Sequence, residues 1–167
     1  MLSQSILTAM NDQIKYEFQA AFLYLSMSAY LESLELPGAA AAMRKQSDEE
    51  MEHAMKFFDY INDRNSRVTL QALEQPQTNF ASPLAAFEAA LGHEQKVTGL
   101  INAIYDAAVK EKDFASQQFL DWFVNEQVEE EKSATLRVAR WKMAEGHPGA
   151  MLLLDHEMEE GSEGAGE

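Results

Sequence analysis

The sequence predicts an all-α protein: a four-helix bundle with a long crossover between its second and third helices, followed by a short fifth helix. Four stretches of roughly thirty residues place apolar side chains at helical spacing and contain few helix breakers. Short breaks separate the first stretch from the second and the third from the fourth, whereas about 18 residues separate the second from the third. Short links join antiparallel neighbours, and the long connection can travel the length of the bundle.

The first two predicted helices end at clear breaks in the sequence. The first runs from about Gln4 to Leu34, contains no Gly or Pro, and ends at the sequence LELPG. The second runs from about Gly38 to Arg64 and ends at the polar sequence NDRNSR. Residues 65–82 then form the long crossover between the two halves of the bundle.

Capping residues mark the start of the third and fourth predicted helices. Ser82 is a favourable N-cap and Pro83 occupies the first helical position, so a third helix begins there and runs to about Glu111. Asp113 caps a fourth helix, which continues up to Gly146. Glycine is the residue most often found just beyond a helix C-terminus, so the fourth helix is expected to stop there.

The chain divides into three segments. Residues 1–146 form the four-helix bundle, residues 147–160 contain a short apolar helix, and residues 161–167 form a low-complexity acidic tail that is expected to be disordered. At 167 residues the chain is long enough for one domain with a sizeable core. A single compact domain is therefore expected.

The composition is strongly acidic. Asp and Glu number 28 against 13 Lys and Arg, and the net charge is −15, which disfavours nucleic acid and anionic membranes as partners and favours cations. The chain contains no cysteine, which excludes disulfides and thiolate metal centres. No basic leader precedes an apolar run, and no segment reaches the roughly 18 apolar residues needed to span a bilayer. We therefore expect a cytoplasmic protein.

Each predicted core stripe is interrupted near the middle of its helix by a polar side chain. The interrupting residues, in chain order, are Glu17, Glu50, Glu94, Gln127 and Glu130, and His53 lies at the edge of the second stripe. Aligned helices bring these side chains to one level of the bundle. Uncompensated buried carboxylates cost several kcal/mol each, so a cation is expected among them. Oxygen ligands with one imidazole suit iron or manganese.

Each of these residues taken alone has a plainer interpretation. A single Glu-x-x-His pair on a helix is more often part of a solvated face than a ligand pair, and one glutamate within a stripe commonly reaches water. Interruptions on all four helices, at one level, instead favour a metal site. Two of the glutamates, together with the pair Glu50 and His53, provide most of the ligand set of ferritin-like di-iron bundles.

Four sequence motifs carry a resemblance to the ferritin family. They are YEFQAAFLYLSMSAY around Glu17, SDEEMEHA around Glu50, HEQ around Glu94, and WFVNEQVEEE, which ends in the segment containing Glu130. The resemblance covers about residues 3–160 and is greatest to bacterial and archaeal non-haem ferritins. It includes the crossover and the short last helix.

The resemblance implies a role for each of the interrupting residues. Glu17, Glu50 and His53 would hold the first iron of a di-iron ferroxidase centre, and Glu50, Glu94 and Glu130 the second, with Glu50 bridging and Gln127 hydrogen-bonding nearby. A third iron site matches Glu49, Glu126, Glu129 and Glu130, and the aromatic residues beside the centre match Tyr24 and Trp122.

The resemblance also implies the activity and the assembly. Ferritins oxidise Fe²⁺ to Fe³⁺ with O₂ and store ferric oxyhydroxide inside a hollow shell of 24 subunits. Residues 147–160 would pack at a subunit interface near the four-fold axes. On the first helix Phe18, Phe22 and Leu25 give a second apolar face, which also favours contact between subunits.

Departures from related families separate the alternatives. A di-iron or di-manganese oxidase or catalase would favour a second Glu-x-x-His pair, but the fourth helix has Gln127-x-x-Glu130, and mainly carboxylate ligands suit an iron that passes through. A passive cage subunit would lack ligands such as Glu17 or His53, which are present. Met51 falls where bacterioferritins place a haem ligand, but haem is not expected, because a methionine on a helix is more often a packing residue.

Overall fold

The computed structural model describes residues 1–163, with the backbone alone for residues 160–163. Five α-helices account for the described fold: α1 (Gln4–Glu32), α2 (Pro37–Asp63), α3 (Pro83–Glu111), α4 (Phe114–Ala144) and α5 (Pro148–Glu163). The four-helix bundle, the long crossover and the short fifth helix of the predicted fold class are confirmed. Part of the predicted acidic tail, 161–163, belongs to α5, and residues 164–167 lie outside the described residues.

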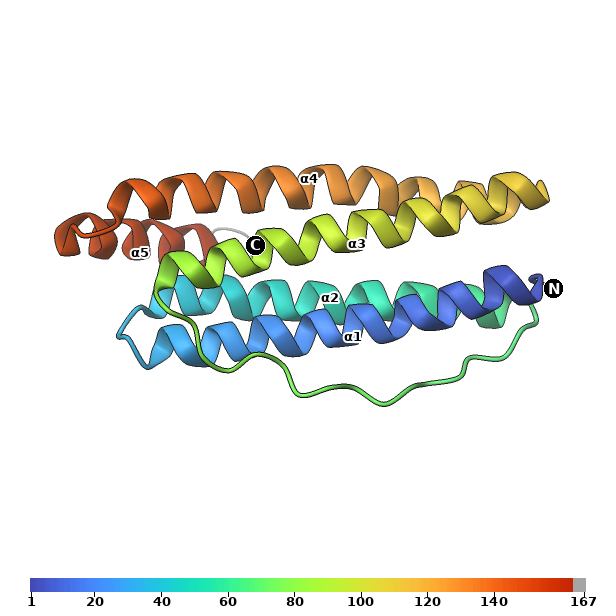
Figure 1. Ribbon diagram of the computed structural model, residues 1–167, viewed down its shortest axis with the longest axis horizontal. Helices are drawn as coiled ribbons and strands as arrows, with labels where there is room; N and C mark the ends of the chain where they lie inside the picture. Colours follow the sequence, from blue (N-terminus) through green and yellow to red (C-terminus); the bar gives the residue numbers. More distant parts are fainter. Residues whose placement is uncertain (164–167) are drawn as a thin grey trace.

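The helices are arranged as two antiparallel pairs. Helices α1 and α2 form one pair, α3 and α4 form the other, and α1 packs against α3. The crossover runs as an extended segment along the outside of the bundle, from the end that contains the N-terminus to the end that carries α5 (Figure 1). This path lets α3 start beside the end of α1, as the length of the connection predicts.

The helix boundaries follow from local chemistry. The hydroxyl of Ser82 accepts from the backbone amide of Ala85 at 3.1 Å, and the carboxylate of Asp113 accepts from the amide of Ser116 at 3.2 Å, so both predicted caps are present. Gly146 has φ +75°, a left-handed conformation that favours glycine just beyond α4. The first helix ends at Glu32, two residues before the predicted Leu34, because the turn into α2 begins earlier.

Two apolar clusters flank a polar level in the middle of the bundle. The cluster near α5 includes Met27, Leu31, Phe87 and Trp141, and the cluster near the N-terminus includes twelve buried residues with Ile14 among them. The interrupting glutamates lie between these clusters and are buried. Burial of the two apolar clusters therefore has to stabilise the fold against the cost of the polar level between them.

Helices α2 and α4 are spaced more widely than the other neighbours. No Cα atom of α2 lies within 8 Å of a Cα atom of α4 in the described part of the chain. Closely packed helices have axes only about 8–10 Å apart, so this spacing leaves room for side chains that reach inward from both helices.

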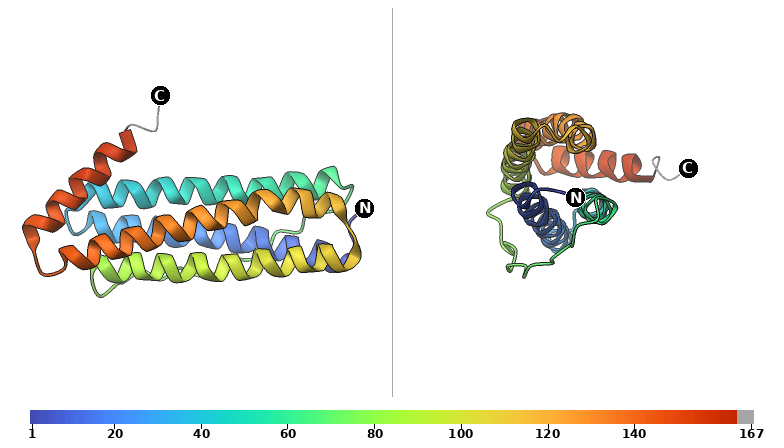
Figure 2. Two further views of the ribbon diagram at one scale, coloured as in Figure 1. Left: turned by 90° about the horizontal axis from the view of Figure 1, so that it is seen from above. Right: turned by 90° about the vertical axis from the view of Figure 1, so that its right-hand side faces the viewer.

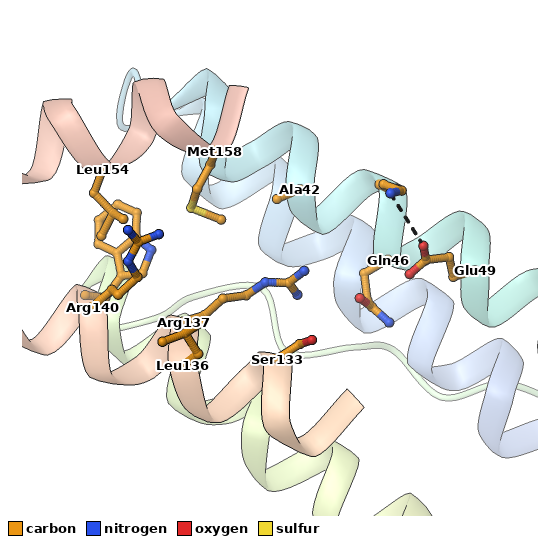
Figure 3. A pocket seen from close by; sticks show the side chains of 11 residues that line it. Ala42, Gln46, Glu49, Ser133, Leu136, Arg137, Arg140, Leu154 and Met158 are labelled. Carbon is orange, nitrogen blue, oxygen red and sulfur yellow. Dashed lines mark ion pairs between the residues drawn. The ribbon is translucent and has the colours of Figure 1, made fainter. Parts of the chain in front are cut away.

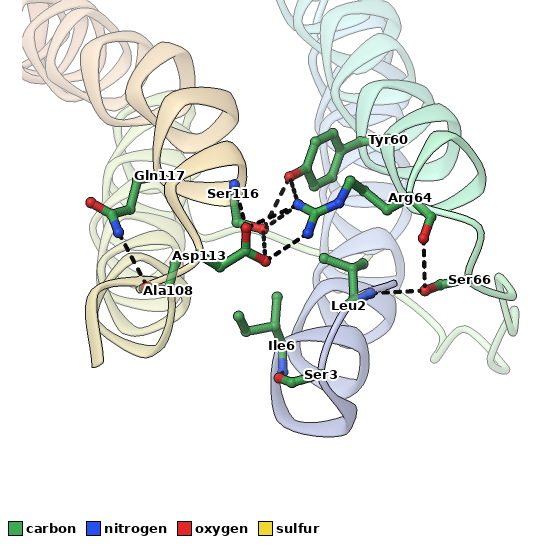
Figure 4. Close-up of polar contacts among 10 residues, drawn as sticks. All are labelled: Leu2, Ser3, Ile6, Tyr60, Arg64, Ser66, Ala108, Asp113, Ser116 and Gln117. Atoms are coloured by element: carbon green, nitrogen blue, oxygen red, sulfur yellow. Dashed lines mark hydrogen bonds and ion pairs between the residues drawn. The ribbon is translucent and has the colours of Figure 1, made fainter. Parts of the chain in front are cut away.

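A charged network joins the end of α2 to the turn between α3 and α4 (Figure 4). The guanidinium of Arg64 pairs with Asp113 at 3.0 Å and also donates to the hydroxyls of Tyr60 and Ser116. Because Asp113 is also the N-cap of α4, one carboxylate fixes both the start of α4 and its distance from α2.

Helix α5 is anchored to the start of α2. Leu36, the N-cap residue of α2, forms no side-chain hydrogen bond to the first turn of the helix. Instead, the carboxylate of Asp155 on α5 accepts a hydrogen bond from the backbone amide of Ala39 at 2.7 Å. Gly38 lies so close to α5 that an added Cβ would be 1.9 Å from the carbonyl oxygen of Asp155. Helix α5 consequently crosses the end of the bundle at an angle and leans over α2 (Figure 2).

Candidate metal centre

The structure brings three of the predicted ligands together at the middle of the bundle. Glu17 comes from α1, and Glu50 and His53 come from consecutive turns of α2, since three residues separate neighbours on one helix face. One ligand atom of each lies within 4.8 Å of the others, and all three side chains are buried. In the described residues this is the one group of three or more metal-binding side chains that meets this distance.

Two further glutamates reach the same level from the other helix pair. The amide of Gln46 donates to Glu50 at 3.2 Å and to Glu130 at 3.0 Å, which links α2 to α4. The amide of Gln127 donates to the Glu94 carboxylate at 3.3 Å. The helices therefore present four buried carboxylates at one level, as the interrupted stripes predict.

Crowding of these carboxylates shifts their protonation. Burial, and then the negative charge of Glu50, raises the pKa of Glu94 to about 8, and the same two causes raise the pKa of Glu17 well above its usual range. Burial also raises the pKa of Glu130.

Glu50 and His53 behave as an ion pair within this group. Burial opposes the charge on Glu50, but the hydrogen bond and the charge of His53, with hydrogen bonds from Glu17 and Gln46, together outweigh burial and lower the pKa of Glu50. Burial likewise opposes the charge on His53, whose pKa is nevertheless raised by its 3.3 Å contact with Glu50. Glu50 is thus the most readily ionised of the four buried carboxylates, and it lies next to the other two predicted ligands, Glu17 and His53.

An unsatisfied oxygen shows that the group fits a cation. One oxygen of Glu17 accepts from Gln13 at 2.8 Å, while its other oxygen, Oε2, is buried without a hydrogen-bond partner. A buried carboxylate oxygen without a partner is costly, and a bound metal ion would satisfy it. The oxygen-rich donor set with one imidazole suits iron or manganese.

Comparison with known proteins decides the family. Residues 7–144 match the family model described as a ferritin-like domain. The chain belongs to the ferritin family. Two relatives named bacterial non-heme ferritin are similar: one from Campylobacter jejuni is 39% identical over 93% of both chains, and one from Staphylococcus saprophyticus is 42% identical over 78% of both chains.

Solved structures agree with this assignment. An open pore ferritin from the hyperthermophilic archaeon Archaeoglobus fulgidus superposes with a TM-score of 0.94 at 44% identity, covering 95% of this chain and 98% of that chain. A form of the Archaeoglobus fulgidus ferritin engineered to be closed gives a TM-score of 0.93 at 44% identity, covering 95% and 97%. The predicted resemblance to prokaryotic non-haem ferritins is confirmed.

Three polar residues of this ferritin support the centre but escaped the sequence analysis. Gln13 donates to Glu17, Gln46 donates to Glu50 and Glu130, and Thr98 accepts from Gln127 at 3.2 Å. Gln13 and Gln46 each precede a ligand by four residues, one turn earlier on the same helix face. That spacing was a usable signal, because amides at such positions can orient a carboxylate.

Two aromatic residues of this ferritin, Tyr24 and Trp122, contact predicted iron ligands. Tyr24 donates a hydrogen bond to Glu94, and burial, followed by the charge of Glu94, raises the Tyr24 pKa well above its usual value. The ring of Trp122 meets the ring of His53 edge-on, with centroids 5.4 Å apart. Both aromatic side chains therefore contact predicted iron ligands directly.

The residues predicted for a third iron are less closely gathered. Glu49 pairs with Lys45 at 3.9 Å and Glu129 pairs with Lys132 at 3.5 Å, while Glu130 faces Gln46. Glu126, also predicted for this site, is partly buried on α4. The third iron site stays a prediction.

No helix in the described part of this ferritin has both the length and the apolar character needed to cross a membrane.

Proposed function

We propose that this ferritin oxidises Fe²⁺ with O₂ at the buried centre and stores the ferric product as mineral. Iron is the substrate, and the family relationship and the buried ligand group support this activity. The observation that carries the assignment to the centre is the meeting of Glu17, Glu50 and His53 around an unsatisfied carboxylate oxygen.

The proposed roles divide the ligands between two iron ions. Glu17, Glu50 and His53 hold the first, and Glu50, Glu94 and Glu130 hold the second, so Glu50 is shared by both. Anionic ligands favour Fe³⁺ over Fe²⁺, and two ions held close together can each deliver one electron to the same O₂ molecule. Gln127 orients Glu94, and Tyr24 holds the same carboxylate from α1.

The oxidised iron then leaves the centre toward the α2 and α4 side. Glu49, Glu126 and Glu129, with Glu130 shared, form the proposed third iron site. These side chains are more exposed than the ligands of the di-iron centre, as an exit route requires. Glu49 and Glu129 are each paired with a lysine, Lys45 and Lys132, and an arriving iron ion would have to displace these lysines.

The proposed container is a shell of 24 copies in the cytoplasm. Phe22 and Leu25 on α1 are each 48% exposed and form an apolar face away from the centre. Leu152 and Leu153 on α5 are also exposed, which supports a subunit contact formed by residues 147–160. Sedimentation of the native protein at 24 times the 18.8 kDa chain mass would support the shell, and a smaller assembly would contradict it.

Rapid mixing of metal-free protein with two Fe²⁺ per subunit in air tests the proposed centre. Absorbance of the ferric product is followed in the native protein, in Glu50→Gln, and in Glu52→Gln as a matched control, because Glu52 is an exposed neighbour on the same helix. Oxidation should slow at least tenfold in Glu50→Gln alone. Equal rates in all three proteins would disprove the assignment.

A further inference from the structure

A pocket opens beside the metal centre where α2, α4 and α5 meet (Figure 3). Its volume is about 300 Å³. It occupies the wide gap between α2 and α4, and Gln46 separates it from the predicted ligands Glu50 and Glu130. Small-molecule sites in proteins begin at roughly this volume, and they combine apolar walls with a few polar groups.

Three basic side chains line the pocket, which is unusual for so acidic a chain. Lys45, Arg137 and Arg140 all line it, although the chain has 13 basic residues against 28 acidic ones. Lys45 is paired with Glu49, and Arg140 is paired with Glu157 at 3.0 Å. Two of the three cations in the wall therefore already have counter-charges.

Arg137 is the one of these three cations that forms no ion pair in the described part of the chain. Its side chain extends from α4 into the pocket toward α2 (Figure 3). The guanidinium has no ion-pair or hydrogen-bond partner among the described residues, although its charge does lower the pKa of Glu49 against the larger effect of burial. The hydroxyl of Ser133, one helical turn before Arg137, lines the same wall and is likewise unpaired within the described chain.

Apolar side chains also line the pocket. Trp141 and Leu154 are buried in its wall, and Leu136 and Met158 contribute to it. The indole nitrogen of Trp141 is buried without an acceptor. Arg140 lies beside Leu154 but is already paired with Glu157, so this part of the pocket offers its apolar surface to a carbon chain (Figure 3).

We propose that this pocket binds a small amphipathic carboxylate. The guanidinium of Arg137 takes the carboxylate in a two-point contact, supported by the Ser133 hydroxyl, and the carbon chain lies against Trp141 and Leu154. Arginine is suited to this because its planar donors match the two oxygens of a carboxylate. None of the side chains that hold the carboxylate is a predicted iron ligand, and the pocket is present in the metal-free protein.

Equilibrium dialysis of the assembled metal-free protein with radiolabelled octanoate tests this site. The expected result is saturable binding of one octanoate per subunit. Octanol, which lacks the charge, and inorganic phosphate, which lacks the chain, should each compete at least about tenfold less well than unlabelled octanoate. No saturable binding, or competition by phosphate or octanol that equals octanoate, would overturn the proposal.

Matched variants locate the binding. Arg137→Gln should weaken octanoate binding by about tenfold or more, whereas Arg44→Gln, which removes the same charge from an exposed position on α2, should leave it unchanged. Leu154→Ala should weaken octanoate more than butanoate, since only the longer chain extends from Arg137 to Leu154 (Figure 3). Equal losses in both arginine variants would mean a general charge effect and would also overturn the proposal.

Discussion

The phenol of Tyr24 donates a hydrogen bond to the carboxylate of Glu94 and so joins α1 to α3 at the level of the metal centre. This bond lowers the pKa of Glu94, although burial and the charge of Glu50 still raise it to about 8. Tyr24 consequently favours the ionised form of a proposed iron ligand. Its effect on the site is electrostatic as well as positional.

Replacement of Tyr24 by Phe is expected to slow iron oxidation by about threefold to tenfold at pH 7. Without its donor, Glu94 holds a proton more tightly and competes less well for the second iron. The rate of ferric absorbance after mixing measures this. Part of the lost rate should return as the pH is raised above 8, because Glu94 then ionises without assistance.

Tyr105→Phe is the control for this experiment. Tyr105 on α3 donates to Asp121 on α4 at 3.0 Å, a bond between two helices that lies outside the metal centre. The substitution removes one tyrosine hydroxyl and one carboxylate contact, and it should leave the oxidation rate unchanged. A loss of similar size in both variants would show that Tyr24 acts through general packing.

Metal binding is expected to release protons. At pH 7 the pKa of Glu94, raised to about 8, keeps a proton on the metal-free centre, and a divalent cation must displace it; burial raises the pKa values of Glu17 and Glu130 in the same direction. Zn²⁺ is the preferred probe because it is not oxidised, and an indicator dye in weak buffer counts the protons. Release should decrease as the starting pH rises above about 8.

The Glu94→Gln variant distinguishes the source of these protons. It should release about one proton fewer than the native protein at pH 7, since the side-chain amide of glutamine has no titratable proton. Equal release in both proteins would show that Glu94 is already ionised before metal binds.

Stability of the metal-free protein is expected to fall as the pH rises from 6 to 8. The folded protein binds more protons than the unfolded chain in this range, because burial raises the pKa of Glu94 to about 8. Stability therefore decreases with pH, by about 1.4 kcal/mol per pH unit for each extra proton held. The raised pKa of His53 acts in the same direction. Melting temperatures across this range measure the effect.

Glu94→Gln should have a flatter dependence of melting temperature on pH than the native protein. A saturating concentration of Zn²⁺ should also flatten the native curve, because bound metal replaces the protons. A native curve that rises toward pH 8 would contradict the direction of these pKa shifts.

The level of the centre was predictable because periodicity alone places residues on a helix face. Glu17 and Glu50 interrupt helix stripes whose other residues are apolar and buried. Their positions along the bundle can therefore be read from the sequence. The caps Ser82 and Asp113 were predictable for a similar reason, since they contact amides only three residues away. Local geometry determines all of these features.

The features that escaped prediction depend on distant parts of the chain. Asp155 caps α2 across a separation of 116 residues, and no local pattern indicates that a fifth helix supplies this carboxylate. The pocket around Arg137 likewise arises from the spacing of α2 and α4, which depends on packing of the whole bundle. Periodicity identifies which face is buried, but it does not give the distance to the helix opposite.

Gly38→Ala is expected to displace α5 and destabilise the protein. An added Cβ would lie 1.9 Å from the carbonyl oxygen of Asp155 and 2.9 Å from the amide nitrogen of Glu159, and neither backbone atom can move without shifting the helix. Forced overpacking of this kind costs about 1–3 kcal/mol, and loss of the bond from Ala39 to Asp155 adds to it. A lower melting temperature of the metal-free protein would report this.

Gly92→Ala on α3 is the matched control, because apart from the adjacent residues and backbone of its own helix no described atom lies within 4 Å of an added Cβ. An alanine in a helix interior is favoured over glycine by roughly 0.5–1 kcal/mol, so this variant should melt slightly higher than the native protein. The two substitutions are chemically identical, and opposite shifts in melting temperature would isolate the contact between α2 and α5. If Gly38→Ala also melted higher, close packing of α5 on α2 would not be a feature of the protein in solution.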